Sequence, residues 1–96
     1  MKPVPKTVLQ LIRQERILFS KKAWSQILNG MFTLDDLIYS IIHGVLIKKE
    51  KDELEQSSYK YIIIGPALSG TPIYSCGKII THEEKSYFVI TFHEVK

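Results

Sequence analysis

The strongest constraint on the fold of this chain is a change in hydrophobic period near Val45. Before this residue, apolar side chains recur three or four positions apart, which is the spacing of amphipathic helices. After it, the period becomes two, and β-branched and aromatic residues dominate, as in half-buried strands. Helices in the first half and strands in the second predict an α+β domain of two layers.

Three helical segments are predicted before Val45. Each follows a residue whose side chain can cap a helix N-terminus, because its oxygen can accept a hydrogen bond from an exposed backbone N–H group. The expected caps and helices are Thr7 with Gln10 for a helix over about 7–15, Ser20 for a helix over 21–28, and Thr33 for a helix that ends at Gly44.

Four strands are predicted after Val45, and the short connections between them favour antiparallel pairing. The expected strands cover about 45–51, 59–65, 72–80 and 87–94. We therefore expect two or three N-terminal helices packed on one face of a four-stranded, mainly antiparallel sheet. A chain of 96 residues has room for one such domain, spanning 1–96, with disorder an open alternative for residues 1–6.

Alternation along the predicted strands divides their side chains between a core face and an exposed face. In the last strand, Phe88, Ile90 and Phe92 are expected to face the helices. The exposed face would then gather Tyr59, Tyr61, Tyr74, Lys78, Tyr87, Thr91 and His93. Aromatic rings stack on unpaired bases and cations hold phosphates, so this face is typical of an RNA-binding sheet. The alternative is that tyrosine is simply a common strand residue.

Charge and cysteine content narrow the class of protein further. Thirteen Lys and Arg residues against ten Asp and Glu residues give a net charge of +3 and a pI near 9.0, which favours a polyanion or an acidic protein as partner. The single Cys76 cannot form an internal disulfide, which fits a reducing compartment. The N-terminal segment lacks the pattern of a signal peptide or a membrane span, so we expect a cytoplasmic protein.

Most catalytic motifs are absent from the sequence. The three histidines are too scattered for a metal-ligand motif, and neither a phosphate-binding glycine loop nor a serine nucleophile elbow occurs. No cofactor is therefore expected. Metal-independent cleavage of RNA needs only a proton acceptor, cations and a hydroxyl donor. The candidates are His93, Lys78 and Tyr74 for catalysis, and Lys22, Arg16, Tyr59, Tyr61, Tyr87 and Thr91 for RNA binding.

Four segments of the chain resemble a known family. They are residues 17–23, 32–37, 72–79 and 89–94, which include Phe19-Ser20-Lys21-Lys22-Ala23 and Val89-Ile90-Thr91-Phe92-His93-Glu94. They are similar to those of a prokaryotic family, domain of unknown function 4258, which in turn resembles the RelE/MqsR group of toxin ribonucleases. This resemblance spans about residues 17–94. It implies a RelE-like two-layer sandwich, mRNA as substrate, and a zinc-finger or helix-turn-helix antitoxin as partner.

The chain departs from that family at positions that matter for catalysis. Lys22 stands where the family has His, Gln26 and Ile27 stand where it has Arg and Met, and His93 replaces a Tyr. Two functions therefore stay open: a metal-independent mRNA endoribonuclease of a toxin-antitoxin system, or a catalytically inactive RNA- or protein-binding module of the same fold. A small-ligand domain or an enzyme of another class is a third alternative.

Overall fold

Three helices and six strands make up the part of the chain that the computed structural model describes, residues 2–52 and 58–96. The helices are α1 (Lys6–Arg13), α2 (Lys21–Asn29) and α3 (Leu34–Ile42). The strands are β1 (Lys2–Pro3), β2 (Ile17–Phe19), β3 (Val45–Lys51), β4 (Tyr59–Pro66), β5 (Pro72–His82) and β6 (Glu84–Glu94). The α+β class predicted from the change of period is confirmed.

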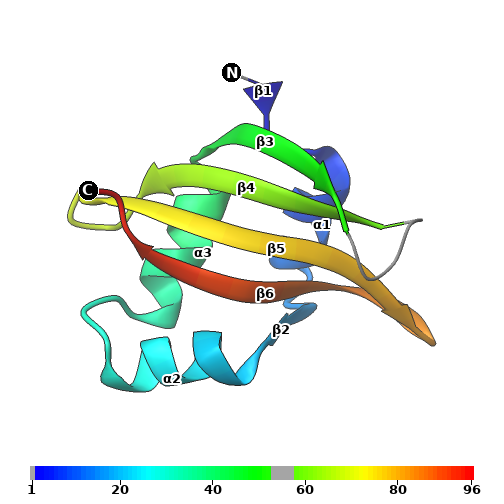
Figure 1. The fold of residues 1–96 in the computed structure, drawn as a ribbon, viewed down its shortest axis with the longest axis horizontal. Coiled ribbons are helices and arrows are strands. Elements are labelled where there is room, and N and C mark those ends of the chain that lie inside the picture. The colour runs from blue at the N-terminus through cyan, green and yellow to red at the C-terminus, as the bar shows by residue number, and fades with distance from the viewer. Residues whose placement is uncertain (1, 53–57) are drawn as a thin grey trace.

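The strands form one mixed sheet in the order β1-β3-β4-β5-β6-β2. The four long strands follow one another as an antiparallel meander, as expected. The prediction of only four strands was wrong, because β1 pairs antiparallel with β3 and β2 pairs parallel with β6. Both additions are two or three residues long, too short to show an alternating pattern. In Figure 1, α1 and α3 lie behind the sheet and α2 runs along its β6 side.

The helix starts follow the predicted capping residues at two of three positions. The Ser20 hydroxyl accepts a hydrogen bond from the Ala23 N–H at 3.0 Å and begins α2. Thr33 and Asp36 form a reciprocal capping box at the start of α3. The predicted box at Thr7 was wrong, because α1 begins one residue earlier, after Pro5, without a side-chain cap. A proline before the first turn sets the backbone without needing a hydroxyl.

The predicted faces of β6 were wrong along half of the strand. Cys76 pairs with Thr91 while the next residue, Gly77, pairs with Val89, so Ile90 is an extra residue in β6. A β-bulge of this kind moves the side chains on one side of it to the opposite face. Phe92 faces the helices as expected, but Tyr87 and Val89 share that buried face and Phe88 points to the other.

Tyr87 fits onto the helix side of the sheet because Gly77 lies beneath it. A Cβ atom at Gly77 would come within 2.5 Å of the Tyr87 ring and hydroxyl, so any side chain there would displace the ring. Tyr87 has no exposed surface, and its hydroxyl has no hydrogen-bond partner among the described residues. Burial raises the pKa of this hydroxyl. Tyr87 is thus a core residue and lies outside the predicted RNA-binding face.

The tyrosines of β4 also lie on the helix side. Tyr61 pairs with Gly77, packs against the core, and therefore shares the face of Val89 rather than that of Thr91. Tyr59 lies two residues before it on the same face, and the Lys49 ammonium sits 4.3 Å above the Tyr59 ring. The prediction that Tyr59, Tyr61 and Tyr87 stand on the exposed face was wrong.

Beyond the three residues that pair with β2, the edge of β6 is hydrogen-bonded by two side chains, Ser20 at the N-cap of α2 and Gln26 within it. The Ser20 hydroxyl donates to the Ile90 carbonyl at 2.6 Å. The Gln26 side-chain oxygen accepts from the Phe92 N–H at 3.2 Å and from the Thr91 hydroxyl at 3.3 Å. Unpaired backbone groups on an edge strand recruit other chains, so these contacts protect the edge while fixing α2 to the sheet.

The buried hydroxyl of Tyr87 gives a test of its assignment to the core. We expect Tyr87→Phe to leave the free energy of unfolding unchanged or to raise it by up to about 1 kcal/mol, since a buried polar group without a partner is removed. Urea unfolding followed by far-UV circular dichroism measures this. A loss of more than about 1 kcal/mol would mean that the hydroxyl is hydrogen-bonded.

The capping box of α3 makes stability depend on pH. Asp36 accepts hydrogen bonds from the Thr33 and Leu68 N–H groups at 2.9 and 3.1 Å, and the Thr33 bond is the main cause of its lowered pKa. A carboxyl with a lowered pKa stabilises the fold above about pH 4 and loses this effect as the pH falls through the lowered value. We expect Asp36→Ala to cost about 1 kcal/mol at pH 7.

The same unfolding series at lower pH tests the cause of that cost. The difference between wild type and Asp36→Ala should shrink as the pH falls from about 4 through the lowered pKa of Asp36, because the carboxylate of the folded protein becomes protonated there. Asp35→Ala is the matched control, because Asp35 lies in the same first turn of α3 but makes none of these hydrogen bonds. An equal cost in both variants, or a difference independent of pH, would contradict the capping role.

Candidate functional site

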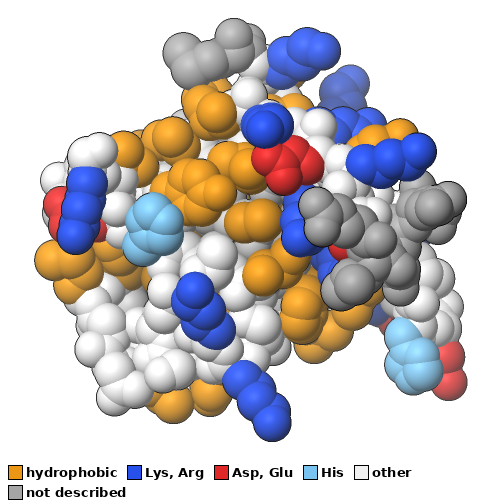
Figure 2. Space-filling view, viewed as in Figure 1, with side chains coloured by type: hydrophobic (Ala, Val, Ile, Leu, Met, Phe, Trp, Pro, Cys, Tyr) orange, Lys and Arg blue, Asp and Glu red, His pale blue; other side chains and the backbone are white. Residues whose placement is uncertain are grey.

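One face of the sheet carries no helix, and we call it the open face. Residues paired across the strands share a face, which places Lys60, Lys78 and Phe88 together, and likewise Ile64, Tyr74 and His93. Its side chains are Lys48, Glu50, Lys60, Ile62, Ile64, Tyr74, Cys76, Lys78, Phe88, Thr91 and His93. Figure 2 shows hydrophobic side chains over the middle of this face, with basic side chains around them.

The lysines of the open face lie beside carboxylates. Lys48 forms an exposed ion pair with Glu50 at 2.9 Å, which raises the pKa of Lys48 and lowers that of Glu50. Glu50 in turn lies opposite Lys60 in the β3–β4 pairing. Cys76 is part-buried on this face, and burial raises the pKa of its thiol, so the thiolate is disfavoured. The open face is thus mildly basic, with an apolar middle.

Lys78, a predicted catalytic residue, has a structural contact. Its ammonium forms a 2.9 Å ion pair with Asp52, whose side chain is 1% exposed. The Asp52 N–H also donates to the Ser58 carbonyl, so this carboxylate lies where β3 ends and the chain returns toward β4. Two like charges, Lys60 and Lys78, face each other across β4 and β5, and Asp52 offsets their repulsion.

The cations predicted to bind RNA lie apart from one another. Arg16 forms an ion pair with Glu84 at the start of β6. Lys22 lies exposed on the first turn of α2. Neither residue lies on the open face, so the structure does not bring these two cations together with Lys78.

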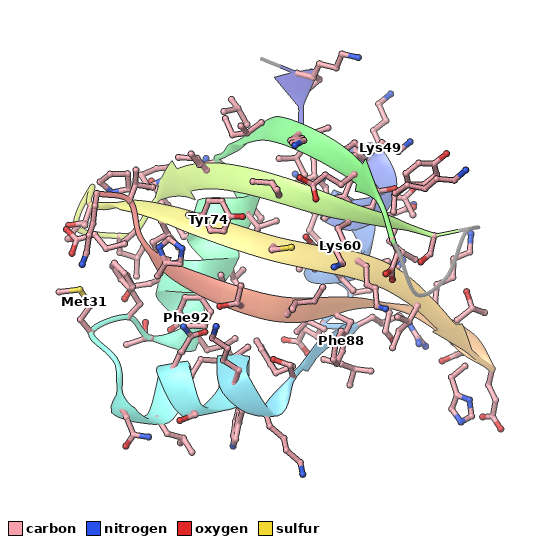
Figure 3. All side chains as sticks on the ribbon, in the orientation of Figure 1. Met31, Lys49, Lys60, Tyr74, Phe88 and Phe92 are labelled. Atoms are coloured by element: carbon pink, nitrogen blue, oxygen red, sulfur yellow. The ribbon has the colours of Figure 1, made fainter. Side chains whose placement is uncertain are left out.

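A cavity of about 860 Å³ opens between the C-terminal half of α2, the α2–α3 loop and the end of β6. Pockets of roughly 300–1,000 Å³ are the usual size for small-molecule sites. Phe32 and Phe92 are buried among its walls, while Met31 is 72% exposed at its rim. Figure 3 shows Met31, Phe92 and Tyr74 around this end of the sheet, with Lys60 and Phe88 farther along the strands. The polar lining residues are Ser25, Gln26, Asn29, Tyr74, His93, Glu94 and Lys96.

Tyr74 and His93 stand together at this cavity. Their rings are stacked, with centroids 4.7 Å apart and an angle of 15° between the planes. Nδ1 of His93 lies 2.9 Å from the Glu94 carbonyl oxygen, which can only accept, so Nδ1 carries the proton. Nε2 of the neutral ring is then a proton acceptor without a partner among the described residues. Partial burial raises the pKa of the Tyr74 hydroxyl, which therefore remains a hydrogen-bond donor.

The structure thus unites two of the three predicted catalytic residues. Lys78 follows Tyr74 by four positions on β5, which is about 13 Å along the strand. The Lys78 ammonium is bound to Asp52, so the structure does not direct it toward Tyr74. Reasoning from the sequence missed Gln26, Asn29, Glu94 and Lys96 as cavity residues. Glu94 and Lys96 lie within three residues of His93 in the sequence. The side-chain amides of Gln26 and Asn29 reach the cavity only because of where α2 lies.

The ion pair of Lys78 predicts an effect on stability. We expect Lys78→Ala to lower the free energy of unfolding by about 3 kcal/mol, because it removes one partner of a mostly buried pair. Lys48→Ala is the control on the same face, since it breaks an exposed pair and should change stability very little. Urea unfolding of the two variants measures the difference. Equal effects would show that burial of Asp52 does not strengthen its pair with Lys78.

Searches for other marks of function gave negative results. In residues 2–52 and 58–96, no three His, Cys, Asp or Glu side chains are grouped so that they could hold a metal ion. In the same ranges, no helix has the length and apolar character needed to cross a membrane. Comparisons with protein-family models, curated proteins and solved structures found no match to this chain.

Proposed function

We propose that this protein is a metal-independent endoribonuclease of the toxin type, whose reaction centre is His93 at the mouth of the cavity at the end of β6. The observation that carries the proposal is the stacked pair of Tyr74 and His93 at that cavity, with Nε2 of His93 available as a proton acceptor. Lys78 is not part of the proposed reaction centre, because its ammonium is bound to Asp52 and its position on β5 lies about 13 Å from that of Tyr74 along the strand.

In the proposed reaction, Nε2 of His93 removes the proton of a ribose 2′-hydroxyl. The 2′-oxygen then forms a bond to the adjacent phosphorus, and the bond from phosphorus to the 5′-oxygen of the next nucleotide breaks. The leaving oxygen takes a proton from water, giving a 2′,3′-cyclic phosphate and a 5′-hydroxyl end. Lys96, which lines the cavity, is the cation nearest in sequence that can stabilise the charged phosphorane.

Tyr74 is proposed to act as a positioning residue. Its ring stacks on one face of the imidazole, and the contact of Nδ1 with the Glu94 carbonyl holds one edge of the ring, so the ring plane and the tautomer of His93 are both fixed. The open face supplies the approach for the rest of the strand, because Lys48 and Lys60 stand beside the apolar middle of the sheet. The second open function is a catalytically inactive RNA- or protein-binding module. The open face would be its binding surface as well.

The test is cleavage of a labelled mRNA by purified protein in EDTA, with the new ends mapped. We expect His93→Ala to lower the cleavage rate at least a hundredfold, the usual contribution of a general base. His82→Ala is the matched control, because His82 lies exposed at the far end of β5 and should leave the rate unchanged.

The outcomes separate the two open functions. Cleavage that persists in His93→Ala would overturn the assigned reaction centre. Binding of the RNA without cleavage by folded wild-type protein would favour the binding module instead. The salt dependence of RNA binding would then distinguish contacts with phosphates from apolar contacts with bases, since only the contacts with phosphates release counterions.

A further inference from the structure

We infer that the cavity at the end of β6 holds one unpaired nucleobase of an RNA strand, inserted between His93 and the α2–α3 loop. This inference rests on the proposed RNA substrate and deepens it, since it states which part of the strand enters the site. The walls of the cavity come from α2, the loop after it, and the last residues of β6.

The interior of the cavity favours a flat, largely apolar group. Its walls include the buried rings of Phe32 and Phe92, and its rim carries the exposed thioether of Met31. His93 is an exposed residue whose imidazole stacks on Tyr74 through one ring face. A base can stack on the other face of the imidazole, as bases do on aromatic side chains in single-strand recognition.

Two side-chain amides on α2 offer the hydrogen bonds that the edge of a base requires. The Gln26 oxygen is occupied by the Phe92 N–H and the Thr91 hydroxyl, which leaves its NH₂ group as a donor. The Asn29 NH₂ group donates to the Ser25 carbonyl and hydroxyl, which leaves its oxygen as an acceptor. The two residues are three positions apart on one helix, so one donor and one acceptor stand on the same wall.

Charge argues against a phosphate as the group inside the cavity. Lys96 is the one lysine or arginine among the lining residues, and Glu94, which also lines the cavity, brings a negative charge to it. A phosphate in the interior would therefore meet a like charge beside its single cation, whereas a neutral base would not. The phosphates are better placed outside the interior: the scissile phosphate at the mouth, beside the exposed His93 and Lys96, and the others over Lys48 and Lys60 on the open face.

The test uses a single-stranded RNA in which one residue is 2-aminopurine, a base whose fluorescence falls when it stacks. All riboses carry 2′-O-methyl groups, so the strand cannot be cleaved and binding is measured by itself. We expect the fluorescence to fall when the wild-type protein binds. A tryptophan placed in the cavity by Asn29→Trp should abolish this fall and weaken binding about tenfold, within the range for loss of one stacked base.

Leu28→Trp is the matched control, because Leu28 is an exposed residue next to Asn29 on α2 and does not line the cavity. It should keep the fall in fluorescence and bind within about threefold of wild type. A second arm uses free 2-aminopurine riboside, which should bind far more weakly than the strand if the base arrives as part of RNA. Tight binding of the free riboside, with no binding of the RNA strand, would overturn the inference that the base belongs to RNA.

The result also separates this inference from the proposed function. Salt-sensitive binding of the strand that is equal in wild type and Asn29→Trp, with no change in fluorescence, would overturn the base cavity while leaving RNA binding intact. Failure of every RNA to bind the folded protein would overturn the proposed function itself. Circular dichroism of Asn29→Trp and Leu28→Trp establishes that both variants are folded before these comparisons are made.

Discussion

The packing of Tyr87 over Gly77 is the contact on which the arrangement of the sheet depends. A large ring can lie on the helix side of β5 only because Gly77 has no side chain, and the ring is then fully buried. The bulge at Ile90 follows in the same strand, and it returns Phe92 to the core while His93 stays on the open face beside Tyr74. The position of the candidate catalytic pair is therefore set by a fit in the core.

This dependence explains what could be predicted from the sequence. The periods of two and 3.6 predicted the three helices and the four long strands, because hydrophobic spacing is a local property. Strand parity also placed Tyr74, Lys78 and His93 on one face correctly. It failed for Tyr87, because one extra residue exchanges the faces and a bulge has no signal in the alternating pattern of a single strand.

The remaining features arise from contacts between distant parts of the chain. Ser20 and Gln26 form hydrogen bonds with backbone groups of β6, and no local sequence pattern predicts contacts between residues so far apart in the chain. The β5–β6 turn was expected between the predicted strands, at 81–86, but the strands continue to His82 and Glu84 because the single residue Glu83 makes the turn in a left-handed backbone conformation, with φ of 69°. The ion pair of Lys78 depends on Asp52, 26 residues earlier, which a reading of strand faces could not supply.

The parallel pairing of β2 with β6 has a consequence for the synthesis of the protein. Ser20 and its partner Ile90 are 70 residues apart, and β2 contacts residues 87–89. While the ribosome is still translating the middle of the chain, α2 therefore has no strand to lie against. The walls of the cavity meet only after β6 has emerged, so a nascent chain that still lacks β6 cannot assemble the cavity. Whatever this cavity binds, it can bind only after the last strand of the sheet has been synthesised.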